Sequence, residues 1–141
     1  MEGECQTSTE KTTLSLVLLR HCESLFNSGA DVKSPNVGLS AKGEAQAAAL
    51  KGMADAELVI CSPMLRCKQT LELSHLAKQA RKNKRVIVQP LCREHCTDAC
   101  DFMEGEPNSA EDIESEAAVL QRVAAFKKWL RKLHQTTSPQ K

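Results

Sequence analysis

Residues 18–27 read Leu18-Leu19-Arg20-His21-Cys22-Glu23-Ser24-Leu25-Phe26-Asn27, with an arginine and a histidine side by side. The apolar run Leu14-Ser15-Leu16-Val17-Leu18-Leu19 leads into this pair and has the length of a strand buried on both faces. Because α/β sheets bind ligands at the carboxyl ends of their strands, the pair lies where chemistry is expected. Arg20 offers a planar fork of donors suited to phosphate, and the His21 imidazole can attack phosphorus and leave again. The stretch predicts a phosphoryl-transfer site; a basic pair that merely closes a strand is the alternative.

Four motifs place this stretch in a wider pattern. The first is Arg20-His21-Cys22-Glu23-Ser24 with Asn27 after it. The others are Leu39-Ser40-Ala41-Lys42-Gly43-Glu44-Ala45-Gln46-Ala47, Cys61-Ser62-Pro63-Met64-Leu65-Arg66-Cys67-Lys68-Gln69-Thr70 and Pro90-Leu91-Cys92-Arg93-Glu94-His95. In this order they resemble the histidine phosphatase superfamily, also called the phosphoglycerate-mutase-like family, from about Leu14 to the end. The third motif is the most specific, since its Ser-Pro start, its arginine and its Gln-Thr close rarely coincide.

The resemblance implies a three-layer α/β/α fold with a mostly parallel sheet, here in residues 14–141 after a flexible leader over 1–13. Cys22 stands where the family has glycine. The family's second catalytic histidine has no counterpart, so we expect a partial domain that ends after the helix preceding the last core strand. Its turnover is then expected to be very low. An exposed sheet edge left in this way predicts possible self-association.

The pattern of strands and helices agrees with this fold class. Short apolar runs predict strands over Leu58–Cys61 and Arg85–Val88. Ser40 is placed to cap a helix over Ala41–Lys51, and Ser62 to cap a helix that begins at Pro63 and ends near Lys78. From Ala110 a long helix carries apolar residues at helical spacing. They are Ile113, Ala117, Leu120, Val123, Phe126, Leu130 and Leu133. Alternation of strands and helices predicts a parallel sheet.

Five residues are candidates for the phosphoryl group. His21 is the candidate nucleophile, by position and by resemblance, and a hydrogen-bonded structural histidine is the alternative. Arg20 and Arg66 are expected to hold the phosphoryl oxygens. Arg66 lies one turn into the helix predicted to begin at Pro63, whose free amide groups favour an anion; an ordinary surface arginine is the alternative. Ser24 and Asn27 add neutral donors, and Glu23 orients the loop.

Glu94 is the candidate general acid. A carboxyl near the leaving oxygen can protonate it if burial or a neighbouring anion raises its pKa. A salt-bridged structural glutamate is the alternative, because the residues after Glu94 depart from the usual family pattern.

A competing hypothesis is a zinc site formed by Cys92, His95, Cys96 and Cys100. Thiolates and imidazole are ligands that zinc prefers, and four within nine residues are enough for a tetrahedral site. Adjacent His95 and Cys96 chelate awkwardly, however, and paired Cys-x-x-Cys clips are missing. We therefore predict no metal and no cofactor, with thiols that simply lie in a loop.

Composition limits the remaining possibilities. The chain has 141 residues, is 41% hydrophobic and carries a net charge of +1, which gives no footprint for nucleic acid. It has no membrane-length apolar stretch, and its polar acidic start is unlike a signal peptide. Together these features predict a cytoplasmic protein whose seven cysteines are mostly reduced.

Function follows from the resemblance and the candidate residues together. The sequence predicts a phosphomonoesterase that works through a phosphohistidine at His21 on a phosphorylated small molecule or phosphoprotein. Phosphatase is preferred to mutase because long insertions are missing. The alternative is a non-catalytic protein on the same fold that binds phosphate or a phosphoprotein, and a zinc module is the third.

Overall fold

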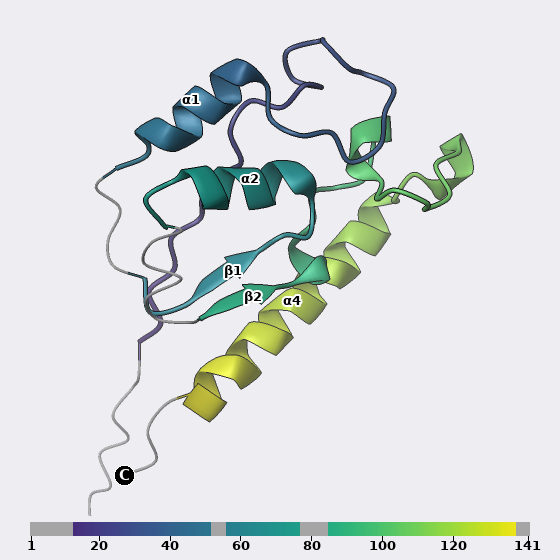
Figure 1. Cartoon of the computed structure of the whole chain (residues 1–141). Helices are drawn as coiled ribbons and strands as arrows, with labels where there is room; N and C mark the ends of the chain where they lie inside the picture. Colours follow the sequence, from purple (N-terminus) through teal and green to yellow (C-terminus); the bar gives the residue numbers. More distant parts are fainter. Residues whose placement is uncertain (1–12, 52–55, 77–84, 138–141) are drawn as a thin grey trace, which may run out of the picture.

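The computed structural model describes residues 13–51, 56–76 and 85–137. Within them two strands, β1 (Val59–Cys61) and β2 (Val86–Val88), pair in parallel with Ile60 opposite Ile87. The helices are α1 (Ala41–Ala49), α2 (Leu65–Leu73) and α4 (Glu116–Thr137), and the single 3-10 turns are η1 (Pro90–Cys92), η2 (Ala99–Asp101) and η3 (Ala110–Asp112). The helix α2 follows β1 in sequence and precedes β2, as a parallel pair requires (Figure 1). The predicted α/β class is therefore confirmed.

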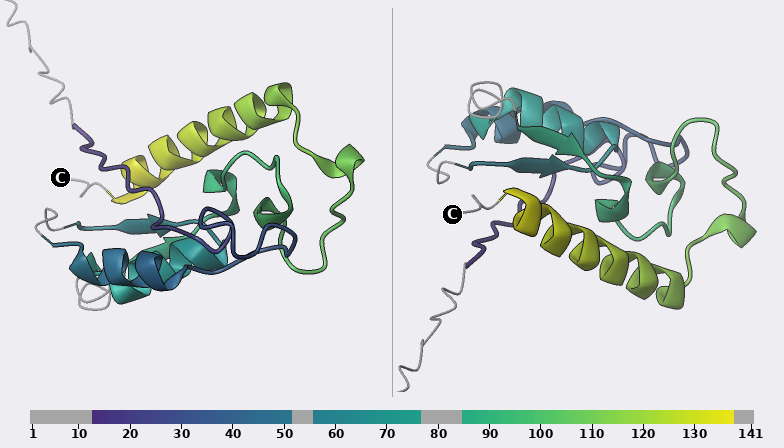
Figure 2. Two further views of the ribbon diagram at one scale, coloured as in Figure 1. Left: turned by 90° about the horizontal axis from the view of Figure 1, so that it is seen from above. Right: turned by 90° about the horizontal axis from the view of Figure 1, so that it is seen from below.

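The helices lie on opposite sides of the strand pair. Helix α4 runs along one side, and α1 and α2 lie on the other (Figure 2). Helix α1 packs against α2, α2 contacts β1, and α4 contacts η1. The larger parallel sheet of a three-layer fold stays a prediction, as does a single domain over 14–141. The predicted leader lies almost wholly outside the described residues.

The core surrounds the start of α2. The buried apolar side chains are Val37, Leu39, Ala47, Cys61, Met64, Leu76, Cys100 and Phe102. They come from the segment before α1, from α1 and β1, from residues that flank α2, and from the loop that contains η2. The core therefore joins these elements. None of the helices within the described residues is both long enough and apolar enough to cross a bilayer.

Capping explains where the helices begin. Ser40 caps α1 as predicted, because its Oγ accepts a hydrogen bond from the Gly43 N–H at 3.0 Å. Helix α2 starts later than predicted: its N-cap is Met64, and Ser62 and Pro63 precede the helix. The reason lies outside the local sequence, since the Leu65 N–H donates to Asn36 Oδ1 at 2.8 Å. Tertiary contact thus supplies the cap that Ser62 was expected to provide.

Both ends of the predicted elements shift as well. Helix α1 ends at Ala49 and α2 at Leu73, each short of the prediction. The last helix begins at Glu116 after the turn η3, and not at Ala110. Leu120 and Val123 of its predicted apolar face are exposed, whereas the Phe126 ring stacks on Trp129 with centroids 5.8 Å apart.

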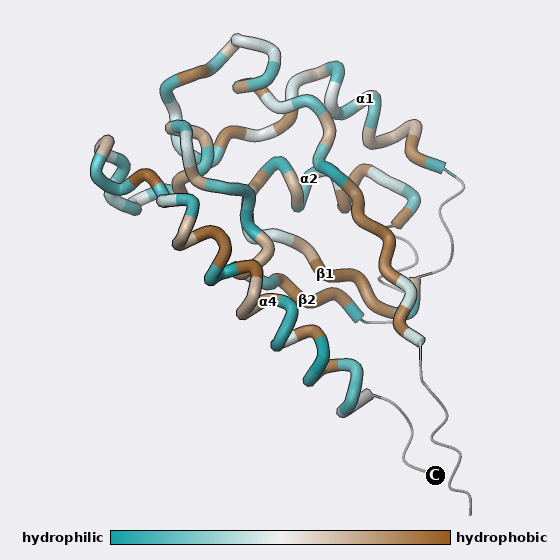
Figure 3. The backbone as a smooth tube through the Cα atoms, turned by 180° about the vertical axis from the view of Figure 1, so that it is seen from behind, coloured by the Kyte–Doolittle hydropathy of each residue, from teal (hydrophilic) through white to brown (hydrophobic). Residues whose placement is uncertain are grey.

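The predicted first strand is wrong. Residues 14–19 form no strand, and the side chain of Leu18 is 91% exposed. Figure 3 shows the run as a hydrophobic stretch that begins where the uncertain N-terminal trace ends. A strand needs a neighbour for its N–H and C=O groups, and no described residue pairs with this run through the backbone. The apolar composition of residues 14–19 predicted a strand, but it did not specify a neighbouring strand for the run to pair with.

Candidate active site

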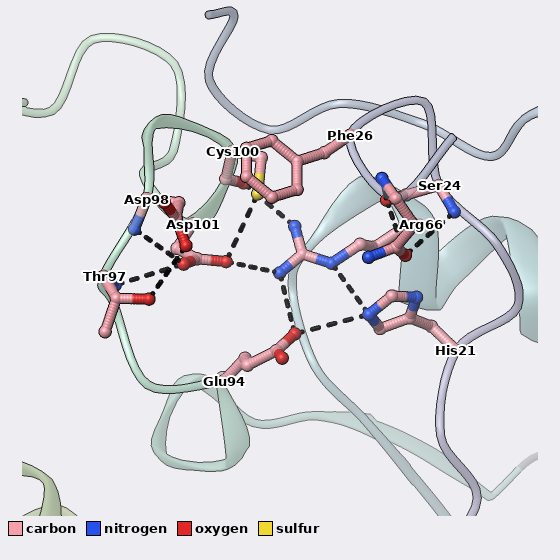
Figure 4. A pocket seen from close by; sticks show the side chains of 10 residues that line it. His21, Ser24, Phe26, Arg66, Glu94, Thr97, Asp98, Cys100 and Asp101 are labelled. Atoms are coloured by element: carbon pink, nitrogen blue, oxygen red, sulfur yellow. Dashed lines mark hydrogen bonds and ion pairs between the residues drawn. The ribbon is translucent and has the colours of Figure 1, made fainter. Parts of the chain in front are cut away.

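Three segments meet at one pocket (Figure 4). They are the loop after residue 20, the first turn of α2, and the loop from residue 94 to residue 101. The lining residues are His21, Ser24, Phe26, Asn27, Arg66, Glu94, Thr97, Asp98, Cys100 and Asp101. Residues from three of the four sequence motifs therefore gather in space, although they are separated by up to 73 positions.

The His21 ring is held with one nitrogen fixed and the other facing the pocket. Its Nδ1 lies 2.7 Å from the Cys22 carbonyl oxygen, which can only accept, so Nδ1 carries the hydrogen. In the neutral ring Nε2 then carries a lone pair, which accepts the hydrogen bond from Arg66 Nε. Nε2 lies 3.2 Å from Arg66 Nε and 3.3 Å from Glu94 Oε2. The backbone of Cys22, rather than its side chain, thus orients the candidate nucleophile.

Arg66 lies at the centre of the pocket. Its side chain is only 2% exposed, so the alternative of an ordinary surface arginine is wrong. Nη1 donates to the Cys100 carbonyl at 2.9 Å, and Nη2 donates to Glu94 Oε2 at 3.2 Å and to Asp101 Oδ1 at 2.9 Å. With Nε directed at His21, every nitrogen of the guanidinium has a protein partner. A phosphoryl group must therefore displace one of these partners.

Glu94 is the Arg66 partner that a ligand can displace, because its carboxylate is exposed to solvent. Its side chain is 48% exposed, and its contact with His21 first, and then those with Arg66, lower its pKa to about 2, although burial opposes them. The His21 contact is a hydrogen bond only when Nε2 carries a proton, because the neutral ring has its single hydrogen on Nδ1. The carboxylate is therefore ionised while it contacts these two residues. Its predicted role as a general acid needs those contacts to be replaced.

Ser24 and Asn27 line the pocket and bond to each other. Ser24 Oγ donates to Asn27 Oδ1 at 2.9 Å, and the Asn27 N–H donates back to Ser24 Oγ at 3.1 Å. Arg20, in contrast, is exposed and does not line the pocket. The structure brings together His21, Arg66 and Glu94 with the serine and the asparagine, and leaves Arg20 outside. The phosphate-binding roles of Arg20, Ser24 and Asn27 stay predictions.

Residues of the second motif hold the loop that carries His21. The Glu23 N–H donates to Gln46 Oε1 at 3.0 Å, and Ser40 Oγ donates to Glu23 Oε1 at 2.7 Å. Hydrogen bonds from Ser40 and then Lys42 lower the pKa of Glu23. A Cβ added at Gly43 would lie 1.9 Å from the Glu23 carbonyl oxygen, so glycine permits the close approach of helix and loop.

The third motif holds the same loop from the other side. Thr70 Oγ1 accepts from the Cys22 N–H at 3.1 Å and donates to the Arg66 carbonyl at 2.8 Å. Gln69 Oε1 accepts from the Leu39 N–H at 2.7 Å. The side chains that made the motif recognisable are thus the ones that fix the loop to α2.

Sequence reasoning missed Arg122, which fixes the backbone beside Glu94. Its Nη1 donates to the carbonyls of Leu91 and Arg93 at 3.0 and 2.6 Å, and its Nη2 donates to the Glu94 carbonyl at 3.2 Å. Glu114 pairs with the same guanidinium at 2.7 Å. The available signal was spacing, since Arg122 lies four residues before Phe126 and seven before Trp129, on one face of the helix.

Asp101 was missed as well. It is buried and pairs with Arg66, and the spacing Asp98-x-x-Asp101 matches a cap for the short turn η2. That spacing was the available signal, because it indicates a structured loop rather than a free one.

Three of the four candidate zinc ligands have separate partners. His95 Nε2 lies 2.7 Å from the Glu114 carbonyl oxygen, Cys92 Sγ donates to the Gln89 carbonyl, and Cys100 Sγ approaches Asp101. Across residues 13–51, 56–76 and 85–137, no group of three or more histidine, cysteine, aspartate or glutamate side chains has the arrangement of a metal site. The zinc hypothesis therefore gains no support from the placement of its ligands.

Comparison with known proteins gives one match. A family model described as histidine phosphatase superfamily (branch 1) matches residues 16–138. Neither the curated proteins nor the solved structures gave a significant match.

Proposed function

Since the chain belongs to the histidine phosphatase superfamily, we propose that it hydrolyses a phosphomonoester through a phosphohistidine at His21. Membership supports phosphoryl transfer in general, and the specific reaction is our proposal. The single observation that carries it is the hydrogen bond from His21 Nδ1 to the Cys22 carbonyl at 2.7 Å. Because this bond fixes the hydrogen on Nδ1, Nε2 carries the lone pair, which attacks phosphorus once the phosphoryl group takes the Arg66 Nε donor from it.

The reaction has two steps. In the first, His21 Nε2 bonds to phosphorus, the ester P–O bond breaks, and the leaving oxygen takes a proton from Glu94. In the second, water attacks phosphorus, the N–P bond breaks, and Glu94 takes a proton from the water. The sum is hydrolysis of one ester to an alcohol and inorganic phosphate.

Arrival of the substrate prepares Glu94 for this role. A phosphoryl group bound between His21 Nε2 and Arg66 separates Glu94 from both residues, which removes the contacts that lower the pKa of Glu94. The phosphate charge beside the carboxylate also favours its protonated form. Glu94 then becomes a proton donor in the occupied pocket, although it is ionised in contact with His21 and Arg66.

Trapping the intermediate tests the proposal. The protein is incubated with p-nitrophenyl phosphate, quenched in alkali, which preserves phosphohistidine, and analysed by peptide mass spectrometry. A phosphoryl group on the His21 peptide is expected, and His21→Asn should lose both the adduct and turnover. His75→Asn is the matched control, because His75 is exposed and lies outside the pocket. Undiminished turnover in His21→Asn would refute the mechanism.

A non-catalytic phosphate-binding protein is the second candidate. It is favoured by the acidic character of the pocket, because Glu94, Asp98 and Asp101 line it together with Arg66. Such surroundings oppose a second negative charge in a transition state more than they oppose weak ligand binding. Binding of orthovanadate without any phosphohistidine or turnover would favour this candidate.

A further inference from the structure

We propose that Asp101 is a positioning residue that holds Arg66 in its working orientation, while Glu94 is the partner that leaves when an anion binds. This inference rests on the proposed phosphate site. It assigns two different tasks to two carboxylates that bond to the same nitrogen of Arg66.

Burial separates the two carboxylates. Asp101 is 6% exposed and Glu94 is 48% exposed, although both accept from Arg66 Nη2. The Asp101 contact is also the shorter, at 2.9 Å against 3.2 Å. An ion pair shielded from water is held more firmly than one that water can reach. Exchange with a ligand should therefore begin at Glu94.

The second oxygen of Asp101 keeps its carboxylate in place. Oδ2 accepts from the N–H groups of Thr97 at 3.1 Å and Asp98 at 3.0 Å. The Asp101 carbonyl accepts from Arg93 Nη2 at 2.6 Å. Rotation of the carboxylate away from Arg66 would break the two backbone hydrogen bonds that fix the turn η2.

Arg93 is itself fixed from outside the pocket. Its guanidinium donates to both carboxylate oxygens of Glu106 at 3.0 Å. The support for Asp101 thus extends from the pocket to the surface of the loop. None of these supporting groups takes part in the proposed reaction.

The geometry of Arg66 shows what Asp101 determines. Asp101 and the Cys100 carbonyl hold the two terminal nitrogens on the side of the guanidinium away from His21 (Figure 4). Because the guanidinium is planar, two fixed donors set the direction of the others. Nε and the second hydrogen of Nη2 then face His21 and Glu94, where a phosphoryl oxygen pair can replace the carboxylate.

Asp101→Asn is the central variant, and Asp112→Asn is its matched control. Asp112 has the same place in η3 that Asp101 has in η2, since its Oδ2 accepts from the Ser109 N–H at 2.8 Å. The control therefore loses the same charge and disturbs the same kind of cap, but Asp112 does not line the pocket that contains Arg66. Glu94→Gln tests the second carboxylate.

Two readouts are measured for each variant that is folded by circular dichroism. The first is the Arg66 Nε–H signal in nitrogen-15 NMR, assigned by its loss in Arg66→Lys. The second is the dissociation constant of orthovanadate by calorimetry. Asp101→Asn should broaden the signal and weaken vanadate about tenfold, since a hydrogen bond to a charged group contributes about that factor. Asp112→Asn should match the wild type, and Glu94→Gln should bind vanadate more tightly.

A simple electrostatic role predicts the opposite sign. If Asp101 merely repelled anions, Asp101→Asn would bind vanadate more tightly and keep a sharp Arg66 signal. That result, or an unchanged affinity with an unchanged signal, overturns the proposal.

Two further outcomes are separable. If the wild type binds no vanadate, the proposed phosphate site fails, and the Arg66 signal in Asp101→Asn still decides whether Asp101 positions it. If Asp101→Asn does not fold, the wild-type carboxyl carbon signals decide. Vanadate should shift the signal of Glu94 and leave that of Asp101 in place, and equal shifts would overturn the proposal.

Discussion

Replacing Gly43 with alanine should destabilise the protein, although alanine is the better helix former. An added Cβ would lie 1.9 Å from the Glu23 carbonyl oxygen and 2.9 Å from its carbon. Since these are backbone atoms, the whole segment must retreat by about 1 Å to reach an ordinary contact. That movement strains two hydrogen bonds. In one, the Ser40 N–H donates to the Glu23 carbonyl at 3.0 Å. In the other, the Glu23 N–H donates to Gln46 Oε1 at 3.0 Å.

The competing effects differ in size. Overpacking costs about 1–3 kcal/mol, and one or two weakened hydrogen bonds add about 1 kcal/mol each. The gain in helix propensity from glycine to alanine is only about 1 kcal/mol. We therefore expect Gly43→Ala to lower the free energy of unfolding by about 1–4 kcal/mol.

Urea denaturation followed by circular dichroism measures this change. Ala45→Gly is the control in the same helix: Ala45 is exposed, and its replacement should cost about 1 kcal/mol through propensity alone. The amide NMR signals of Cys22 and Glu23 should move in Gly43→Ala and stay in Ala45→Gly. A Gly43→Ala protein as stable as the wild type, or more stable, would refute the reasoning.

Three further expectations concern the pocket. Arg66→Ala should lower the free energy of unfolding by about 3–5 kcal/mol, because it leaves the buried Asp101 without its cation. Lys42→Ala is the control, because it breaks an exposed pair with Glu23. It should cost less than about 1 kcal/mol in the same denaturation assay. The pKa of Glu94 is about 2 in the folded protein and near 4.5 when unfolded, so the stability it adds is complete above pH 4.5 and disappears as the pH falls towards 2; the difference in stability between wild type and Glu94→Gln should shrink over that range, and a constant difference would contradict the assignment. Cys22 should be the first described cysteine to react with iodoacetamide, because burial raises the pKa of the other five thiols; peptide mapping checks the order of reaction.

Local patterns predicted those elements whose stabilising contacts are close in sequence. The cap of α1 by Ser40 needs only the three following residues, and the prediction is confirmed. Both observed strands fall within the predicted runs, because each is a short apolar run that contains valine and isoleucine. The start of α2 was misplaced because its capping group, Asn36, lies far back in the chain.

Contacts between distant segments explain the remaining differences. Residues 14–19 have the composition of a strand, yet they form none, since strand formation depends on a neighbouring backbone and composition does not specify one. For the same reason the sequence did not show that Arg66 would be buried among carboxylates. Asp101 reaches it only through the folded loop from residue 94 to residue 101.

The sequence by itself determined the family of this protein and the three residues at the centre of its pocket. Residue type and spacing are sufficient for that, because His21, Arg66 and Glu94 lie in motifs that the chain carries whatever its conformation. Tertiary structure alone decided the charges around them: which carboxylate is buried, which is exposed, and that Arg20 lies outside the pocket. The electrostatic energy of a charged side chain depends on its distance from other charges and on its contact with water, and both are set only in the folded chain.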